Sequence, residues 1–228
     1  MNLSASNVSP ALVKPLPDII VIDTCVLISN VVRRLLLRLV DNGLFRPAWS
    51  PIIGDEWRRN AARLWDASPD DIQTQWGDLQ VAYPDADQGD VSEFKEGLKR
   101  SDPKDWHVVA AARKVRERIG PASIAVVTRN IKDFNRAELR GLGLMLLDPD
   151  ELLTRCWQQN ADVVTSALLK IESDFEAVGR VSGPIDEVLK RERLFRLKRL
   201  LAIAAENTQQ HEQVGENVVQ VEVDRQGG

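Results

Sequence analysis

Acidic residues in separate segments of this 228-residue chain stand where a fold could bring them together. They are Asp23, Glu56, Asp102, Asp105 and Asp133. Carboxylates within several ångströms of one another repel, which raises their pKa values and costs stability unless a cation neutralises them. Hard oxygen ligands without a His or Cys cluster suit Mg²⁺ or Mn²⁺ better than Zn²⁺. The pattern therefore predicts an acidic pocket that holds a divalent metal ion.

Two apolar runs are typical of strands buried on both faces of a parallel sheet. Residues 19–22, IIVI, end at Asp23, and residues 124–128, IAVVT, are followed by a polar cluster that contains Asp133. In open α/β sheets ligands bind at the carboxyl ends of the strands, so acids from both runs are expected at one edge. Asp23 alone is also compatible with an ordinary acid at a strand-to-helix junction, where Thr24 could cap the next helix equally well.

The other candidate acids lie on or just before predicted helices. Glu56 lies on a helix that is expected to begin after Ser50, because serine followed by proline is typical of a helix start. Asp102 precedes a helix over residues 103–113, whose alanine run would let it approach the sheet closely. On that helix, His107 is either a metal ligand or base, or a structural hydrogen-bonding residue.

Apolar spacing and turn residues predict the remaining elements of an α/β fold. Further helices are expected over residues 26–40, 69–79 and 91–98, and short strands over residues 45–49, 81–84 and 144–147. Gly43 is expected to close the first of these helices. Buried strands that alternate with helices favour a central parallel sheet flanked by helices.

Composition and periodicity divide the chain into parts with different patterns. They are a flexible polar leader (1–16), the α/β region (17–150), a helical extension (151–205) and a disordered tail (206–228). Residues 218–223 could instead add an edge strand or dock to a partner. The last predicted helix, residues 185–205, has a basic face that either is solvated or contacts a phosphate backbone or a partner.

Composition also limits the class of protein. No apolar run approaches the roughly 20 residues of a membrane span, and the N-terminus lacks the pattern of a signal peptide, so a cytoplasmic protein is expected. Cys25 and Cys156 form neither a disulfide framework nor a CxxC metal motif. A formal charge of −4 argues against a protein that coats nucleic acid, although a net value hides local patches.

Several segments together resemble the PIN domain family, and specifically the VapC-type toxins and their close relatives. The segments are VIDTCVLIS around Asp23, Glu56 with the following WRRN, DPKDWHVVAAA with Asp105, and VVTRNIKDF with Asp133. The resemblance covers roughly residues 17–150 and preserves the order and spacing of the segments; the helical extension resembles one found in some of these proteins. It implies a three-layer α/β fold with a central parallel sheet.

The resemblance also implies roles for individual residues. The ligands of Mg²⁺ or Mn²⁺ would be Asp23, Glu56, Asp105 and Asp133, with Thr128 and Asn130 as positioning groups. Asp102 would join them or only cap its helix, and Asn130 stands where many relatives have an acid. Basic residues that flank the acids would either hold substrate phosphates or balance the acidic charge; they are Arg58, Arg59, Arg129 and Lys132.

The implied activity is hydrolysis of RNA phosphodiester bonds by a metal-dependent endoribonuclease. The implied partners are an RNA substrate, an antitoxin protein and a second copy of the chain in a homodimer. Two alternatives remain: a PIN nuclease in RNA processing that is not a toxin, and a catalytically inactive PIN-like module that binds nucleic acid or protein. A haloacid-dehalogenase-like phosphatase is disfavoured because it needs a second acid two residues after the first, where this chain has Cys25.

Overall fold

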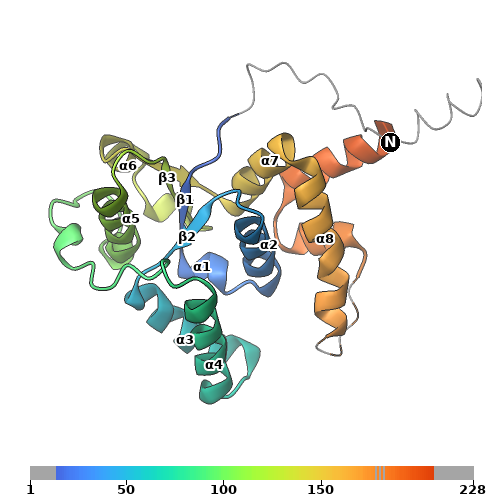
Figure 1. Cartoon of the computed structure of the whole chain (residues 1–228), viewed down its shortest axis with the longest axis horizontal. Coiled ribbons are helices and arrows are strands. Elements are labelled where there is room, and N and C mark those ends of the chain that lie inside the picture. Colours follow the sequence, from blue (N-terminus) through green and yellow to red (C-terminus); the bar gives the residue numbers. More distant parts are fainter. Residues whose placement is uncertain (1–13, 178, 180, 182, 208–228) are drawn as a thin grey trace, which may run out of the picture.

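The computed structural model describes residues 14–177, 179, 181 and 183–207, and within them the chain forms an α/β fold (Figure 1). Its centre is a four-stranded, all-parallel sheet with the order β2-β1-β3-β4. The strands are β1 (Ile19–Ile22), β2 (Arg46–Ala48), β3 (Ile124–Val127) and β4 (Leu144–Leu147). Every residue of β1 and β3 is buried, which explains why both are continuous apolar runs. The predicted parallel sheet is thereby confirmed.

The register of the sheet places the strand ends at one edge. Ile22 of β1 pairs with Val127 of β3, and beyond this pair the backbone N–H of Asp23 donates to the Val127 carbonyl at 3.0 Å. The backbone N–H of Thr128 likewise donates to the carbonyl of Leu147 at 3.1 Å. Asp23 and Thr128 are therefore adjacent at the carboxyl edge, as the sequence predicts.

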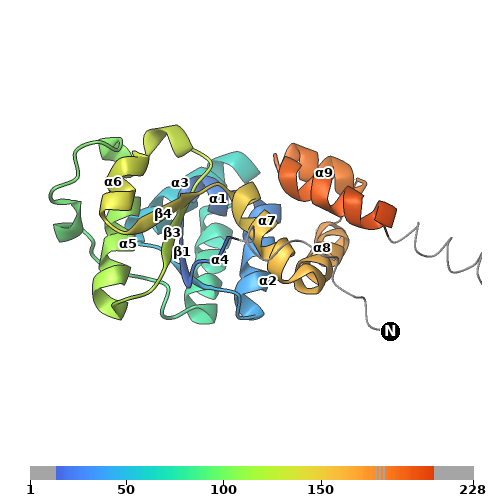
Figure 2. The same cartoon turned by 90° about the horizontal axis from the view of Figure 1, so that it is seen from above.

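Helices cover both faces of the sheet. They are α1 (Thr24–Leu27), α2 (Asn30–Asp41), α3 (Pro51–Trp65), α4 (Pro69–Ala82), α5 (Trp106–Ile119), α6 (Arg136–Gly141), α7 (Pro149–Gln159), α8 (Ala161–Glu176) and α9 (Ile185–Arg191), and residues 195–207 are also helical. Figures 1 and 2 show α5 and α6 on one side of the sheet and α2 and α7 on the other, with α8 and α9 outside them. No described helix has both the length and the apolar character of a membrane span.

Serine caps set the starts of α3 and α4 as predicted. The Ser50 hydroxyl accepts from the backbone N–H of Ile53 at 3.4 Å, and the Ser68 hydroxyl accepts from that of Asp71 at 3.1 Å. A proline follows each cap in the first helical turn, where its missing N–H costs nothing.

Three predicted elements in the α/β region were wrong in detail. The helix over residues 26–40 is broken into α1 and α2, because Ser29 is extended and its hydroxyl caps the Val32 N–H at 3.1 Å. The strand over residues 81–84 is absent, since α4 continues to Ala82. The helix over residues 91–98 is reduced to a 3₁₀ turn at Glu93–Lys95.

The extension is helical, but its last predicted helix was also wrong as a single element. α9 ends at Arg191, and Arg193 has a left-handed backbone (φ 59°) before the helix over residues 195–207 begins. The proposed edge strand at residues 218–223, the leader before residue 14 and the tail after residue 207 lie outside the described residues.

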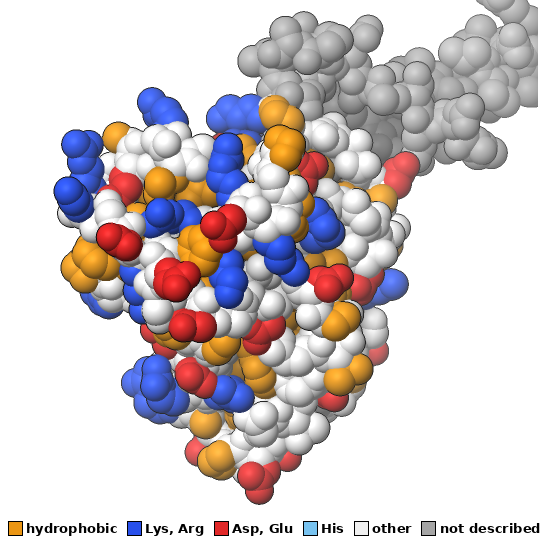
Figure 3. Space-filling model, turned by 60° about the vertical axis from the view of Figure 1, so that its left-hand side comes forward, with side chains coloured by type: hydrophobic (Ala, Val, Ile, Leu, Met, Phe, Trp, Pro, Cys, Tyr) orange, Lys and Arg blue, Asp and Glu red, His pale blue; other side chains and the backbone are white. Residues whose placement is uncertain are grey.

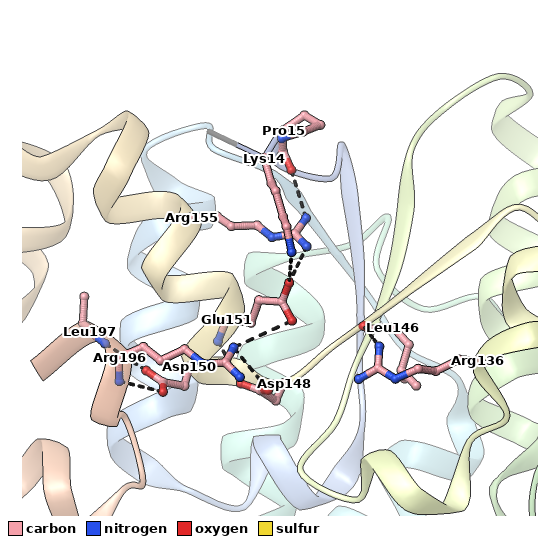
Figure 4. A network of polar contacts seen from close by, with 10 residues as sticks. All are labelled: Lys14, Pro15, Arg136, Leu146, Asp148, Asp150, Glu151, Arg155, Arg196 and Leu197. Carbon is pink, nitrogen blue, oxygen red and sulfur yellow. Dashed lines mark hydrogen bonds and ion pairs between the residues drawn. The ribbon is translucent and has the colours of Figure 1, made fainter. Parts of the chain in front are cut away.

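The N-terminal residues that the structure describes are held against α7 (Figure 4). Arg155 donates to the carbonyl of Pro15 at 3.2 Å and to Glu151 at 2.6 Å, and Lys14 pairs with Glu151 at 3.3 Å. On the other side of the extension, the α8 residue Asp174 pairs with two arginines of α2. The extension is thus joined to the α/β region along its length.

A tryptophan cluster fixes α3. Trp57 is fully buried, its ring centroid lies 5.6 Å from those of Trp65 and Trp76, and its Nε1 donates to the Leu27 carbonyl at 3.1 Å. A Cβ on Gly54 would overlap the Trp76 ring, so the absence of a side chain there lets α4 approach α3. This packing places the next turn of α3 beside α1 at the carboxyl edge of β1.

Candidate active site

Asp23 is the most enclosed of the candidate acids. It is 4% exposed, and its Oδ2 accepts hydrogen bonds from the Thr128 hydroxyl at 2.6 Å and the Cys25 thiol at 3.0 Å. Burial, with the charge of Asp23, raises the pKa of Cys25 to about 12, so the thiol stays protonated and acts as a donor. These donors hold one oxygen of the Asp23 carboxylate in a fixed orientation.

Asp105 approaches the same edge from the turn before α5. It ends the 3₁₀ turn Pro103–Asp105, and its buried Oδ2 has no hydrogen-bond partner among the described residues. Burial raises its pKa from 3.8 to about 6; the charges of Asp23 and Asp133 add to the rise, while Lys104 opposes it. The charges of Asp23 and Asp133 therefore act on Asp105.

Glu56 contacts different partners on the same side of the molecule. Its Oε2 accepts from the Thr24 hydroxyl at 3.0 Å and lies 3.4 Å from Nε2 of the buried His107. Nδ1 of His107 donates to the Lys104 carbonyl at 2.8 Å. Burial acts to raise the pKa of Glu56, but His107, Thr24 and the charge of Arg59 outweigh it and lower the pKa below 4.5. The Thr24 hydroxyl therefore orients Glu56, and the nearby His107 ring contributes to the lowering of its pKa.

No protein-family model, curated protein or solved structure matches the chain. The resemblance to the PIN domain family therefore rests on the quoted sequence segments alone, and function has to be argued from the site.

Asp102 and Asp133 lie on adjoining loops. The backbone N–H of Asp102 donates to the carbonyl of Asp133 at 2.8 Å, and Asp133 ends the 3₁₀ turn Ile131–Asp133. The Asp102 carboxylate accepts from the Lys104 N–H at 3.1 Å, which is the capping role that the sequence left open. The backbone N–H of Asn130 donates to the Thr128 hydroxyl at 3.0 Å, so this segment also supports the bond from Thr128 to Asp23.

Glu138 of α6 clamps the loop that leads to Asp102. Its carboxylate accepts from the backbone N–H groups of Lys99, Arg100 and Ser101 at 2.7, 3.0 and 2.8 Å, and from the Ser101 hydroxyl at 2.7 Å. Burial opposes ionisation, but these donors lower the pKa of Glu138 to about 2. No sequence motif pointed to this residue, because its partners are backbone groups in a distant loop.

Replacing Glu138 by glutamine should give a pH-dependent loss of stability. Because the folded pKa lies below the ordinary value of 4.5, the charge of Glu138 stabilises the fold above about pH 4.5 and ceases to do so as the pH falls toward 2. We expect the free energy of unfolding to fall by about 1–2 kcal/mol near neutral pH, allowing for solvent screening. Urea titrations at several pH values should show this deficit shrinking below about pH 4.5.

The control for this experiment is Glu117→Gln, on the exposed face of α5. It should change the free energy of unfolding by less than about 0.5 kcal/mol. A Glu138→Gln deficit that stays constant down to low pH would contradict a role for the carboxylate charge.

The predicted phosphate-binding residues differ in availability. Arg58 donates to Asp55 and, at 2.8 Å, to Gln73, so it is directed toward α4. Arg129 is held at 2.8 Å by Glu192 of the extension. The charge of Arg59 acts on Glu56, as noted above. Lys132 is exposed and makes no ion pair within the described part of the chain.

The residues present fit a hard divalent cation by their chemistry but do not form a complete ligand shell. Within residues 14–177, 179, 181 and 183–207, no three His, Cys, Asp or Glu side chains are grouped as they stand to hold a metal ion. The buried oxygen of Asp105 nevertheless lacks a partner, and the raised pKa is what a cation would reverse. A cation here would require side-chain adjustment around Asp105.

Several functional contacts were missed by sequence reasoning. Thr24 and Cys25 follow Asp23 directly, so their proximity was available from the sequence, whereas their roles as donors depend on the turn into α1. The contact of His107 with Glu56 depends on how α3 packs on α5. Glu192 had no local signal at all, because its partner Arg129 comes from another part of the chain.

The molecular surface around α5 and α6 has no single sign of charge. On the face shown in Figure 3, Lys and Arg side chains lie among Asp and Glu side chains. Such a face differs from the continuous basic strip that tracks a nucleic-acid backbone. This face therefore offers no continuous basic surface to a polyanion.

Proposed function

We propose that this protein is a divalent-metal-dependent endoribonuclease that hydrolyses RNA phosphodiester bonds. The observation that carries the proposal is Asp105, a half-buried carboxyl group with an orphaned oxygen and a pKa of about 6, within electrostatic reach of Asp23 and Asp133. Acids that repel one another at this edge of a parallel sheet, where ligands commonly bind, lower the stability of the fold unless they hold a cation.

The ion expected in this site is Mg²⁺ or Mn²⁺, held by Asp23, Asp105 and Asp133. When bound, it would supply a water of lowered pKa and neutralise charge on the phosphate. Thr128 and Cys25 fix the orientation of Asp23 by donating to its Oδ2. This preorganisation reduces the rearrangement needed when a substrate arrives.

Glu56 has a different role in the proposal. Because its pKa is lowered and the Thr24 hydroxyl holds it, the Glu56 carboxylate can accept a hydrogen bond from the attacking water and orient that water. The reaction then needs no covalent enzyme intermediate: a water oxygen bonds to phosphorus and releases a proton to solvent, the bond to the leaving oxygen breaks, and that oxygen takes up a proton from solvent.

RNA is the proposed substrate because of the resemblance to PIN domains, and a single strand suits the site because its backbone can bend to reach an enclosed carboxylate. The same resemblance supports a toxin role with an antitoxin partner and a homodimeric state. A neighbouring antitoxin gene, together with growth arrest that co-expression of its product relieves, would support the toxin role over RNA processing.

The test is cleavage of single-stranded RNA by the purified full chain. We expect cleavage in Mg²⁺ or Mn²⁺ that EDTA stops and that Asp23→Asn removes, with Asp78→Asn on the exposed face of α4 as the control that retains it. Cleavage that persists in EDTA or in Asp23→Asn would contradict the proposed metal-dependent activity. A DNA oligonucleotide of the same sequence, cleaved as fast as the RNA, would refute the preference for RNA.

A second candidate function is a PIN-like module that binds nucleic acid or protein without catalysis. The incomplete ligand shell around Asp105 among the described side chains favours this reading. It predicts that Mn²⁺ titrated into the native chain produces no more heat than into Asp23→Asn, and that RNA is bound but never cleaved.

A further inference from the structure

A cavity of about 510 Å³ lies beside the acidic residues, between the α/β region and the extension. Cys25, Arg129, Asn130 and residues 148–150 line it from the α/β region and the start of α7, and residues 192–196 line it from the extension. The lining thus includes three arginines and three acidic residues, Asp148, Asp150 and Glu192. Cys25 also donates to Asp23, and the backbone N–H of Arg129 lies 3.2 Å from the Cys25 sulfur. The cavity and the proposed active site therefore meet at Cys25.

The wall formed by the extension is held at both ends. Glu192 accepts from the Ser29 hydroxyl at 2.7 Å and from Arg129 at 2.8 Å. Asp150, 8% exposed, accepts from the backbone N–H groups of Arg196 and Leu197 at 2.8 and 3.0 Å, and thereby caps the helix over residues 195–207 (Figure 4). The turn between these anchors is preorganised, which lowers the entropic cost of binding a ligand.

Two side chains on this turn are not used by the fold. Phe195 is 56% exposed although its neighbours Leu194 and Leu197 are buried. Arg193 has a left-handed backbone that is unfavourable for a side chain larger than glycine, and in the described ranges its guanidinium makes no hydrogen bond or ion pair. An exposed aromatic ring and a guanidinium without an internal partner thus stand together on an anchored turn and are available to a ligand.

We propose that this cavity is a subsite for the RNA nucleotide next to the scissile phosphate, with its base stacked on Phe195 and its phosphate paired with Arg193. The subsite rests on the proposed function, because it assigns the position of the substrate relative to the acids. A single-stranded nucleotide fits because stacking on an aromatic ring needs an unpaired base, and because a planar guanidinium pairs well with phosphate. Arg196, 3.8 Å from both Asp148 and Glu151, lies along the same wall as a second cation.

The test measures binding separately from cleavage. The full chain is titrated into a fluorescently labelled single-stranded RNA in EDTA, where the proposed hydrolysis cannot proceed, and anisotropy gives the affinity at several salt concentrations. Phe195→Ala should weaken binding roughly 5- to 100-fold. Arg193→Gly, which suits the left-handed backbone and so preserves the fold, should weaken it about 5- to 10-fold and reduce the salt slope by about 0.7.

The controls are Arg199→Ala and Phe195→Leu. Arg199 is exposed on the same basic segment but does not line the cavity, so its removal should change affinity by at most about twofold. Phe195→Leu keeps an apolar side chain but removes the aromatic face, and should lose most of the affinity that Phe195→Ala loses. Thermal unfolding of each variant confirms that it folds.

The outcomes separate this subsite from the proposed function. Native affinity in both Phe195→Ala and Arg193→Gly overturns the subsite, even where the chain cleaves RNA. An equal loss in Arg199→Ala and Arg193→Gly also overturns it, since binding would then be general electrostatics. Loss confined to Phe195 and Arg193 supports the subsite where the chain also cleaves RNA in Mg²⁺. The same loss in a chain that fails to cleave RNA would refute the nuclease and the position next to a scissile phosphate, and would leave a single-strand binding site in the cavity.

Discussion

Asp105→Asn should abolish RNA cleavage in Mg²⁺ and, at the same time, make the metal-free protein harder to unfold. The first effect follows if Asp105 is a ligand, because loss of the metal's several kcal/mol of transition-state stabilisation slows the reaction roughly 10²- to 10⁴-fold. The second follows because the Asp105 carboxylate is half-buried with an unpartnered oxygen and faces the charge of Asp23. A neutral amide removes that repulsion.

The stability effect has a defined dependence on pH. The pKa of Asp105 is raised by burial from 3.8 to about 6, so ionisation destabilises the folded state progressively as the pH rises from about 4 to about 6, and fully above that. Near neutral pH, the free energy of unfolding of Asp105→Asn should therefore exceed that of the native chain by about 1 kcal/mol, after allowance for solvent screening. This gain should vanish below about pH 4.

Urea denaturation in EDTA at several pH values measures the gain in stability, and the cleavage assay measures the loss of activity. Asp78→Asn is the matched control for both, because Asp78 is exposed and distant in sequence from the acidic residues. An Asp105→Asn chain that cleaves RNA normally would remove Asp105 from the ligands. A variant less stable than the native chain near neutral pH would show that the carboxylate has partners that stabilise it.

Trp57→Ala should be among the most destabilising single substitutions in the chain, with a loss of about 3–5 kcal/mol. The fully buried ring packs on Trp65 and Trp76, and Arg33 lies over it at 5.3 Å from the centroid. Arg33 is itself buried, which lowers its pKa to about 10, so loss of the ring also removes a cation–π contact from a guanidinium that cannot reach water.

Two further variants separate the contributions of Trp57. Trp57→Phe keeps much of the apolar contact but loses the hydrogen bond from Nε1 to Leu27, and should cost less than Trp57→Ala. Leu64→Ala lies on the same helix at 59% exposure and should cost less than about 0.5 kcal/mol. Circular dichroism during urea denaturation measures all three. A Trp57→Ala loss no larger than that of Leu64→Ala would rule out the tryptophan cluster as the support of α3.

The strands and helix starts that could be predicted are those governed by local chemistry. β1 and β3 are buried on both faces, so every residue in them is apolar, and this produces a pattern that needs no knowledge of the fold. Ser50 is recognisable because serine followed by proline satisfies the first turn of a helix by itself. The position of Asp23 at the carboxyl edge of the sheet follows from the strand that it ends.

The elements that were missed depend on contacts between distant residues. Ser29 caps α2 and also donates to Glu192, which no local pattern indicates. The pattern of residues 81–84 predicts a weak strand, whereas in the structure α4 extends to Ala82 and the Tyr83 hydroxyl donates to Asp41 at 2.8 Å. In the candidate site, Thr128 was expected as a positioning group and does donate to Asp23. The contacts of Thr24, Cys25 and His107 were not expected, since a single threonine, cysteine or histidine has many possible roles.

The contact between Arg129 and Glu192 has a consequence for how the chain can be divided. A fragment that ends after the last strand would leave Arg129 without its carboxylate partner, and Arg38 of α2 without Asp174, its partner at 2.6 Å. Apolar residues now covered by α8 would also meet water. The α/β region and the C-terminal helices thus have to be kept together in truncation, recombination and domain exchange, although the sequence pattern divides them into two parts.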